Sequence, residues 1–232
     1  MTLTTEDNKI WKVTLVIPTF NEEGNLPYVL PKIPQLVDEV IIVDGHSSDN
    51  TVKEAAKLCP GAQIIYQQGK GKGNALRTGF DHAMGDIVVT MDADGSMNPD
   101  EIIRFVDVLQ NGYDFAKGSR FIHNGGTDDA PGHRLFGNWA LAAITNLFYG
   151  THYTDVTYGF NAFSRRCLEK IKLRSLGFSI ETEMAIKAKK AGMKITEVPS
   201  FESSRISGQA KLNSYRDGWL ILKIIVAERF RE

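Results

Sequence analysis

Short β-branched runs alternate with helical segments through the first half of the chain, and this alternation constrains the fold more than any other feature. Four runs are predicted strands: 12–18, 39–44, 63–67 and 87–92. The segments between them have helical patterns at about 22–33, 50–58 and 73–84. Such an order predicts an α/β fold with a mainly parallel, Rossmann-like sheet flanked by helices. We expect these four strands to be buried on both faces.

After about residue 115 the pattern changes. The expected elements there are a strand at 114–119, a glycine-rich loop at 124–132, helices at 135–148, 180–191 and 214–229, and a strand at 194–199. A chain of 232 residues with 42% hydrophobic content is long enough for one well-filled domain and short for two. We therefore interpret residues 1–232 as a single domain whose second half extends over the first.

Charge and composition exclude several functional classes. The 27 basic and 28 acidic side chains leave a net charge of −1, so no basic field indicates nucleic acid as a partner. The two cysteines, Cys59 and Cys167, lack metal-ligand spacing and are expected to be free thiols in a reducing compartment. The N-terminal segment 1–12 is polar and acidic, unlike a signal peptide. The apolar stretch 219–227 is far below the ~20 residues needed to cross a bilayer.

The triplet Asp92-Ala93-Asp94 follows an apolar strand and is the strongest chemical signal in the chain. In a parallel sheet, ligands bind beyond the carboxyl ends of the strands, which is where both carboxylates are expected. One or two carboxylates with substrate phosphates and water suit Mg²⁺ or Mn²⁺, so Asp92 and Asp94 are candidate metal ligands. A solvated acidic turn is the alternative.

Two other loops on the same edge carry weaker signals. Asp44 ends the second predicted strand, where an acidic side chain can accept hydrogen bonds from a ribose or base, or instead cap a turn. Asp49 fits a cap of the following helix better. The run 69–74 (GKGKGN) matches neither the P-loop nor the dinucleotide pattern. It is interpreted either as a basic loop that holds an anion at a helix N-terminus or as a structural turn.

Basic side chains flank two glycine-containing loops in the second half. They are Arg120, His133 and Arg134 around the first loop, and Arg205 and Lys211 around the second, 206–210. In a chain of near-zero net charge, this set suggests capture of phosphate oxygens, which Arg can bind through two hydrogen bonds.

Carboxylates that could act on protons or sugar hydroxyls occur in two places. Asp155 lies in TDVT (154–157), and Glu181 and Glu183 begin a predicted helix. Each is a candidate base or a group that orients a hydroxyl, or it interacts with the helix dipole, which is the favoured interpretation for Glu181.

Taken together and in order, these motifs resemble the family-2 glycosyltransferases of the dolichol-phosphate mannosyltransferase and polyprenyl-phosphate hexosyltransferase type. The matching motifs are PTFNE (18–22), Asp44, GKGNALRTGF (71–80), GDIVVTMDADGS (85–96), GSRF (118–121), HR (133–134), TDVTYGF (154–160), ETEM (181–184) and EVPSFESSRISGQAKL (197–212). The resemblance covers about residues 12–229, and the combination is far more specific than any one motif. It implies the GT-A fold, a single Mg²⁺ or Mn²⁺ at the Asp-x-Asp motif and inversion at the anomeric carbon.

The resemblance also implies roles for individual residues. Contacts to the nucleotide sugar fall on Pro18, Phe20, Glu22, Asp44, Asp92, Ala93, Asp94, Arg120, Arg205 and Lys211; His133 and Arg134 meet the acceptor phosphate; and Asp94 holds the metal. The residues expected to carry the catalysis are Asp94, Arg120, Arg205 and, if a base is needed, Asp155. Residues 12–119 then form the nucleotide-sugar half, 120–213 the acceptor side and 214–232 an amphipathic helix.

Two positions depart from the family pattern. Many relatives have a second Asp where this chain has Gly45, so base or ribose recognition is expected to differ. Some relatives have a side-chain amide ligand where this chain has Ser96, so the metal is expected to depend more on water.

The expected function is transfer of a hexose from a nucleotide-diphosphate sugar to a polyprenyl or dolichyl phosphate. GDP-mannose is the first candidate donor and UDP-glucose the second. A phosphate monoester, with its second pKa near 6, is already an anionic nucleophile at neutral pH and needs no base. Two alternatives stay open: transfer to a hydroxyl of a saccharide or glycolipid with Asp155 as base, and a non-catalytic nucleotide-sugar-binding subunit.

The segment 214–230 combines apolar bulk with Trp219 and basic residues, and it is expected either to lie in a membrane interface or to pack on the domain. Since many relatives continue into membrane helices, we expect a cytoplasmic protein at the membrane surface, or the soluble part of a longer, membrane-anchored protein.

Overall fold

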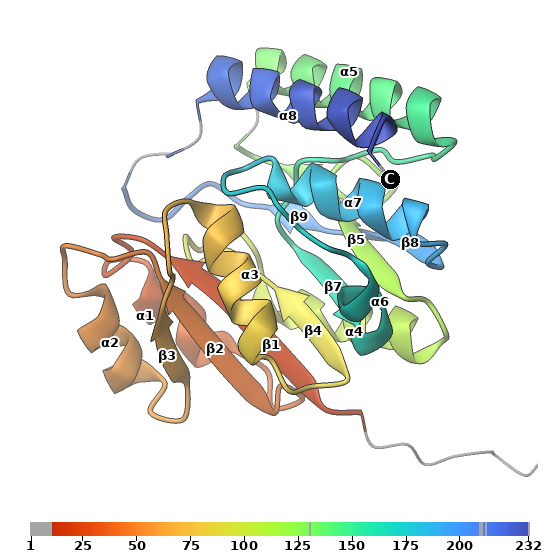
Figure 1. The fold of residues 1–232 in the computed structure, drawn as a ribbon. Coiled ribbons are helices and arrows are strands. Elements are labelled where there is room, and N and C mark those ends of the chain that lie inside the picture. The colour runs from red at the N-terminus through yellow and green to blue at the C-terminus, as the bar shows by residue number, and fades with distance from the viewer. Residues whose placement is uncertain (1–10, 130, 209–210, 212, 232) are drawn as a thin grey trace, which may run out of the picture.

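A computed structural model describes residues 11–129, 131–208, 211 and 213–231, so the segment 1–10, for which no signal peptide is expected, lies outside it. The central sheet has the strand order β3-β2-β1-β4-β7-β5-β8 (Figure 1). Its strands are β1 (Val13–Thr19), β2 (Glu39–Asp44), β3 (Gln63–Tyr66), β4 (Ile87–Thr90), β5 (Phe115–Ser119), β7 (Asn161–Ser164) and β8 (Ile195–Pro199). A small parallel pair joins β6 (Gly126–Thr127) to β9 (Phe201–Glu202).

The parallel half of the sheet confirms the fold class predicted from the sequence. Strands β3, β2, β1 and β4 are mutually parallel, as are β5 and β8. Strand β7 was not predicted; it lies between β4 and β5 and runs antiparallel to both. The expectation that four strands are buried on both faces was wrong for β3. Within the described part of the chain this strand is an edge strand paired with β2 alone, and its end residues Gln63 and Tyr66 are exposed.

The helices are α1 (Leu26–Val29), α2 (Thr51–Leu58), α3 (Lys72–His82), α4 (Ile102–Gln110), α5 (Gly132–Tyr149), α6 (Arg165–Lys170), α7 (Ile180–Lys190) and α8 (Ser214–Arg229), with 3₁₀ turns at Leu30–Lys32 and Pro99–Glu101. The helix predicted at 22–33 is reduced to α1 and a 3₁₀ turn. Pro27 and Pro31 lack amide hydrogens, which explains this short and irregular helix. Helices α4 and α6 were not predicted.

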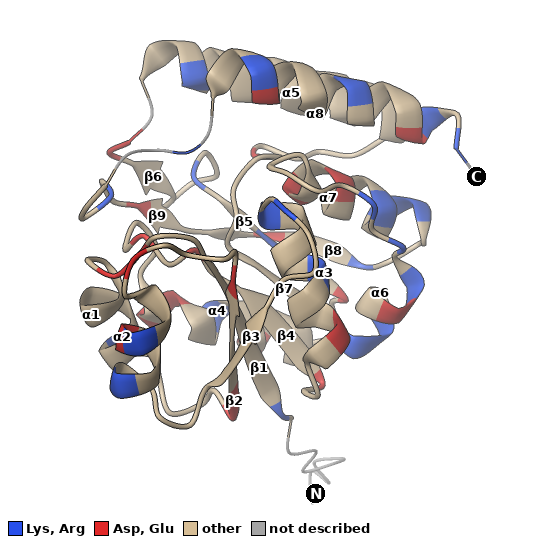
Figure 2. Cartoon of the chain, turned by 60° about the vertical axis from the view of Figure 1, so that its left-hand side comes forward, with Lys and Arg blue, Asp and Glu red and all other residues tan. Residues whose placement is uncertain are grey.

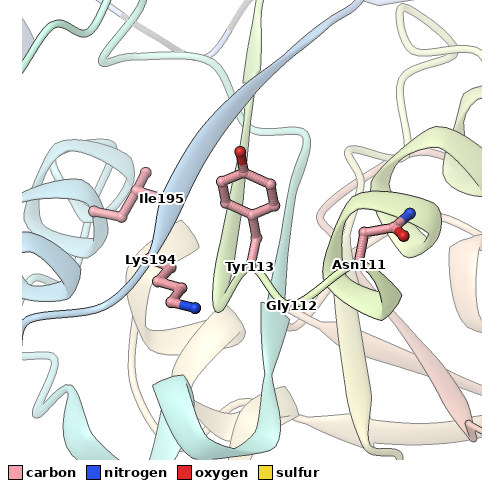
Figure 3. Close-up of a pocket in the computed structure, with 5 residues that line it drawn as sticks. All are labelled: Asn111, Gly112, Tyr113, Lys194 and Ile195. Carbon is pink, nitrogen blue, oxygen red and sulfur yellow. The ribbon is translucent and has the colours of Figure 1, made fainter. Parts of the chain in front are cut away.

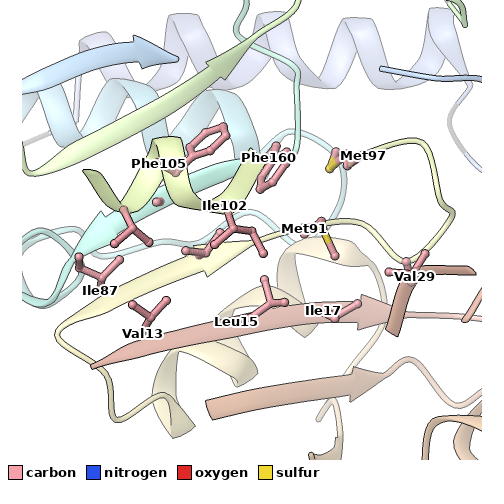
Figure 4. Close-up of a cluster of buried hydrophobic side chains, with 14 of the residues drawn as sticks. Val13, Leu15, Ile17, Val29, Ile87, Met91, Met97, Ile102, Phe105 and Phe160 are labelled. Atoms are coloured by element: carbon pink, nitrogen blue, oxygen red, sulfur yellow. The ribbon is translucent and has the colours of Figure 1, made fainter. Parts of the chain in front are cut away.

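Each face of the sheet has its own apolar core. On one face, Val13, Leu15 and Ile17 of β1 pack with Ile102 and Phe105 of α4, and the stacked rings of Phe105 and Phe160 lie 4.4 Å apart (Figure 4). On the other face, α3, α5, α6 and α7 cover the sheet through a second cluster that includes Leu76, Phe163 and Met184. The two cores hold the strands firmly, so the loops at their carboxyl ends start from fixed positions.

Helices α5 and α8 lie side by side as an outer layer beyond α7 (Figure 1). Ile221 and Ile225 of α8 are buried and pack with Ile186 of α7. Among the described residues, no helix combines the length and apolar character needed to cross a membrane.

Candidate active site

A cavity of about 1280 Å³ opens beyond the carboxyl ends of β1, β2, β3 and β4, the edge predicted from the sequence. Its walls come from segments far apart in the sequence. Of the residues predicted to form the site, the cavity is lined by Pro18, Phe20, Glu22, Asp92, Ala93, Asp94, Arg120, Arg134, Arg205 and Lys211. Asp44, His133 and Asp155 are not among its lining residues.

Both carboxylates of the Asp-x-Asp motif face cations of the protein itself. Asp92 Oδ1 lies 2.6 Å from Lys72 Nζ, and Asp94 Oδ2 lies 2.7 Å from Arg205 Nη2. The other oxygen of Asp94 accepts from the backbone N–H and hydroxyl of Ser96 at 3.0 and 2.7 Å. In this structure both carboxylates are thus paired with side-chain cations.

The donor set suits a divalent ion bound mainly by substrate. No cluster of three or more His, Cys, Asp or Glu side chains with metal-site geometry occurs in the described part of the chain. Asp92 and Asp94 of the Asp-x-Asp motif both line the cavity, and Mg²⁺ is bound by one or two carboxylates when phosphates and water complete its coordination. The residues thus fit Mg²⁺ or Mn²⁺ supplied with a nucleotide diphosphate.

Lys72 links the Asp-x-Asp motif to α7. Its ammonium lies 2.8 Å from Glu181 as well as against Asp92, and Glu181 is buried. Burial raises the pKa of Glu181. Burial alone would lower the pKa of Lys72, but its two carboxylate partners, Asp92 and Glu181, raise it. The helix-dipole interpretation of Glu181 was incomplete, because its principal partner is this lysine.

The glycines beside Lys72 are structural. A Cβ at Gly73 would lie 2.3 Å from the carbonyl oxygen of Ser175, and one at Gly71 would lie 2.3 Å from that of Leu176. Glycine is therefore required at both positions for the chain at 175–176 to approach α3. These glycines therefore have the structural role that was one of the two interpretations of the run 69–74. Lys72 of the same run lines the cavity.

Arg120 forms the most buried ion-pair network of the site. It donates to Asp155 through Nε at 2.7 Å and Nη2 at 3.1 Å, and to Glu202 through Nη1 at 2.9 Å. Burial opposes ionisation of Asp155, but the charges of Arg120 and Lys117 and the hydrogen bonds to the carboxylate together outweigh it, so the pKa of Asp155 is lowered. Asp155 is fully buried and bound through both oxygens, which makes it a poor proton acceptor; the prediction of a base at this position does not fit the structure.

The segment 203–208 crosses the cavity beside the Asp-x-Asp turn. The Ile206 N–H donates to the Asp94 carbonyl at 3.3 Å, and Ile206 Cδ1 would lie 2.3 Å from a Cβ at Gly95. Lys211 lies 2.6 Å from Glu22 and also contacts the Phe20 carbonyl. Both predicted cations, Arg205 and Lys211, are thereby brought to the part of the cavity next to Glu22.

Two predicted contact residues are placed elsewhere. Asp44 is fully buried and accepts from the Ser47 N–H and hydroxyl at 2.8 and 2.6 Å, so it has the turn-forming role that was the alternative to ribose contact. His133 is exposed outside the cavity lining and stacks near Tyr215, with ring centroids 6.4 Å apart. Consecutive helical side chains point in different directions, which separates His133 from the cavity-lining Arg134.

Sequence reasoning missed several polar groups of the site. Glu202, on the two-residue strand β9, carried no local signal, whereas the basic loop 69–74 pointed toward Lys72 without giving it a role. Lys117 was also missed: its buried ammonium donates to the Tyr158 carbonyl at 2.9 Å, and burial lowers its pKa to about 8. It supports the segment that lines the cavity at Thr157, Tyr158 and Gly159.

A smaller hollow of about 420 Å³ lies at the opposite edge of the sheet, where β5 and β8 begin (Figure 3). It is lined by Asn111, Gly112, Tyr113, Lys194 and Ile195. This set holds one cation and no carboxylate, so chemistry is assigned to the larger cavity.

A mainly parallel sheet with an Asp-x-Asp motif at the edge of a cation-lined cavity defines the class as a GT-A-type glycosyltransferase. The sequence model described as Glycosyl transferase family 2 matches residues 14–172. The chain therefore belongs to glycosyltransferase family 2.

Individual relatives agree with this assignment. The chain is 35% identical to glycosyltransferase AglJ of Haloferax volcanii, across 90% of this chain and 69% of the relative. It is 32% identical to a dolichol-phosphate mannosyltransferase of Pyrococcus furiosus (87% and 59% covered) and 30% identical to an undecaprenyl-phosphate mannosyltransferase of Micrococcus luteus (87% and 88%). The chain thus spans less than two thirds of the Pyrococcus protein.

Solved structures support the fold. Glucosyl-3-phosphoglycerate synthase from Mycobacterium tuberculosis, crystallised with Mn²⁺, UDP and glucosyl-3-phosphoglycerate, superposes with a TM-score of 0.73 at 22% identity, covering 94% of this chain and 80% of that one. At this identity the likeness establishes the GT-A fold alone.

Proposed function

We propose that this glycosyltransferase moves a hexose from a nucleotide-diphosphate sugar to a polyprenyl or dolichyl phosphate, with inversion at the anomeric carbon and with Mg²⁺ or Mn²⁺. The observation that carries the proposal is the cavity itself, in which Lys72 and Arg205 contact the two carboxylates of the Asp-x-Asp motif and Arg120, Arg134 and Lys211 also line the wall. Relatives named as dolichol-phosphate and undecaprenyl-phosphate mannosyltransferases support a lipid-phosphate acceptor and make GDP-mannose the first donor to test. UDP-glucose is the second.

The proposed reaction brings two anions together. An oxygen of the acceptor phosphate attacks the anomeric carbon, and the bond from that carbon to the donor's diphosphate breaks, so the electron pair leaves with the nucleoside diphosphate. A bound divalent ion supplies Lewis-acid stabilisation of the departing diphosphate. Arg205 and Lys211 add positive charge on the nucleotide side, and Arg134 is the cation assigned to the acceptor phosphate.

The need for a base differs between transfer to a phosphate and transfer to a hydroxyl. A neutral hydroxyl needs a base, and the candidate Asp155 is held by Arg120 with a lowered pKa. A phosphate acceptor needs no base, which agrees with this arrangement. We assign Arg120 and Asp155 the role of fixing the cavity wall at Thr157, whose hydroxyl accepts from Arg120 at 3.0 Å.

The stereochemistry of the product tests the reaction type. With GDP-α-mannose and a short polyprenyl phosphate, we expect a β-linked mannosyl phosphate, because one in-line displacement inverts the anomeric carbon. The one-bond C1–H1 coupling measured by NMR on the isolated lipid distinguishes the two anomers. An α-linked product would contradict single-displacement inversion, and transfer to a free polyprenol but not to its phosphate would contradict the acceptor.

We further propose that the outer face of α5 and α8 rests on the cytoplasmic surface of a membrane, where a lipid acceptor is found. Exposed apolar side chains gather on these helices: Phe136, Trp139 and Leu147 on α5, and Tyr215, Trp219 and Leu220 on α8. Basic residues, with a few acidic ones, occur along the same helix pair (Figure 2), and the ammonium of Lys223 is 5.5 Å from the Trp219 ring centroid. Apolar aromatic groups mixed with basic ones suit an anionic interface.

Flotation with anionic vesicles tests the membrane proposal. Removing α8 would expose its buried partners, so point changes are better suited. We expect Trp139→Ser combined with Trp219→Ser to weaken vesicle binding by about tenfold, because each ring removes apolar area from the interface. Met84→Ser, which changes a side chain 80% exposed outside these helices, should leave binding unchanged. Equal flotation of the wild type and the double variant would refute the proposal.

A further inference from the structure

Gln67 lies at the end of the cavity where the loops after β1, β2 and β3 meet. Its backbone is held on both sides: its N–H donates to the Asp44 carbonyl at 3.1 Å, and its carbonyl lies 3.0 Å from His46 Nε2. The side chain is only 5% exposed and lines the cavity. The backbone of Gln67 is therefore held in place at the wall of the cavity.

The side-chain oxygen of Gln67 has no hydrogen-bond partner among the described residues. Within the described part of the chain, several buried side-chain atoms have no hydrogen-bond partner, and of these only the atoms of Gln67 and Glu181 belong to cavity-lining residues. Glu181 has Lys72 at 2.8 Å to neutralise it, whereas Gln67 Oε1 has no partner there. A buried polar atom without a partner costs free energy, and at the wall of a cavity it indicates a ligand that supplies the missing group.

The surroundings of Gln67 suit a flat heteroaromatic ligand. Phe20 also lines the cavity and is 46% exposed, and the Lys211 ammonium lies 5.1 Å from its ring centroid. A Cβ at Gly45 would lie 3.3 Å from the Phe20 ring, so glycine here leaves room that any other side chain would take. An aromatic face next to a hydrogen-bonding amide matches the two recognition features of a nucleobase, its π-face and its polar edge.

We propose that Gln67 is a specificity-determining residue that reads the hydrogen-bonding edge of the donor's nucleobase, with Phe20 packed against the base. This inference rests on the proposed function, since it takes the donor to be a nucleotide sugar. A side-chain amide offers both an acceptor and donors, so it pairs with a ring N–H beside a carbonyl, as in uracil and guanine. It thereby gives this chain a base contact in place of the buried Asp44.

Replacing the amide by a carboxylate distinguishes the two bases. A carboxylate only accepts hydrogen bonds. Guanine presents two adjacent donors, its ring N–H and its amino group, whereas the uracil N–H stands between two carbonyl oxygens that repel a carboxylate. Gln67→Glu should therefore raise the ratio of the UDP to the GDP dissociation constant by about tenfold, the scale of one base-edge contact. The ratio cancels the general repulsion between the new charge and the phosphates.

The experiment is calorimetric titration of the full chain with GDP and with UDP in the presence of Mg²⁺. Gln63→Glu is the matched control, because it places the same charge on the exposed side of β3, outside the cavity lining. Gln67→Leu should weaken both nucleotides by about tenfold without changing their ratio, because the amide contact is lost for each base.

Two negative outcomes have different meanings. If the wild type binds a nucleoside diphosphate and the Gln67 variants match Gln63→Glu in both affinities and their ratio, the role of Gln67 is overturned while the proposed function stands. If the wild type binds neither GDP nor UDP, the proposed function is overturned and the role of Gln67 with it.

Discussion

Asp94→Ala is expected to lower the rate of sugar transfer by about 10³-fold, the range found when a key electrostatic group for a leaving anion is removed. Asp94 is the carboxylate that the proposal assigns to the metal, and it lies against Arg205, which faces the same cavity. Replacing Asp94 with alanine removes the proposed metal ligand and leaves Arg205 without its ion-pair partner at this position. Initial rates of nucleoside diphosphate release at saturating metal measure the effect.

Asp94→Asn separates charge from turn structure. The amide oxygen can still accept from the Ser96 N–H and hydroxyl, so the turn at 94–96 is retained while the negative charge is lost. We expect this variant to be nearly as inactive as Asp94→Ala. Asp81→Ala, on the exposed side of α3, serves as the control and should retain full activity. An Asp94→Ala enzyme with more than a tenth of wild-type activity would contradict the assigned metal ligand.

Arg120→Met is expected to destabilise the protein by about 3–5 kcal/mol, because it leaves the carboxylates of Asp155 and Glu202 buried without their cation. Urea unfolding at pH 7 measures the loss. Arg104→Met breaks the comparable pair with Glu101 at the surface, where the Arg104 side chain is 44% exposed, and should cost no more than about 1 kcal/mol. Equal costs for the two variants would contradict a buried network around Arg120.

The difference in unfolding free energy between the wild type and Arg120→Met is expected to depend on pH in a definite direction. The pKa of Asp155 is lowered in the folded protein, so its pairing with Arg120 contributes stability above the ordinary Asp pKa of about 3.9. That contribution is lost as the pH falls through the lowered pKa. The stability difference between the wild type and Arg120→Met should therefore be full at pH 7 and shrink in acid.

The sequence predicted correctly those strands whose apolar pattern matches their burial in the sheet. Strands β1, β2 and β4 are apolar runs with polar ends, and the helices between them predicted their parallel pairing. Strand β7 has four residues, NAFS, and its place between β4 and β5 depends on long-range pairing that leaves no local signal. The edge strand β3 resembles a buried strand in composition, and its exposure arises from the sheet order alone.

For the site, the sequence indicated which loops converge but not how their charges pair. The Asp-x-Asp motif and the basic loops were identified by residue type, and most of their side chains line one cavity. Asp155 looked like an accessible base because the sequence does not reveal that Arg120 binds it from 35 residues away. Gln67 carried no signal at all, since an amide becomes informative only when its burial and missing partner are seen.

The central claim is that a lipid phosphate accepts the sugar. The most direct test is release of nucleoside diphosphate from GDP-mannose and from UDP-glucose, with Mn²⁺ or Mg²⁺, in the presence and absence of a short polyprenyl phosphate. The proposal predicts that release from one donor requires the metal and is strongly stimulated by the polyprenyl phosphate, while the matching polyprenol has no effect. Donor binding without stimulation by the phosphate would contradict it.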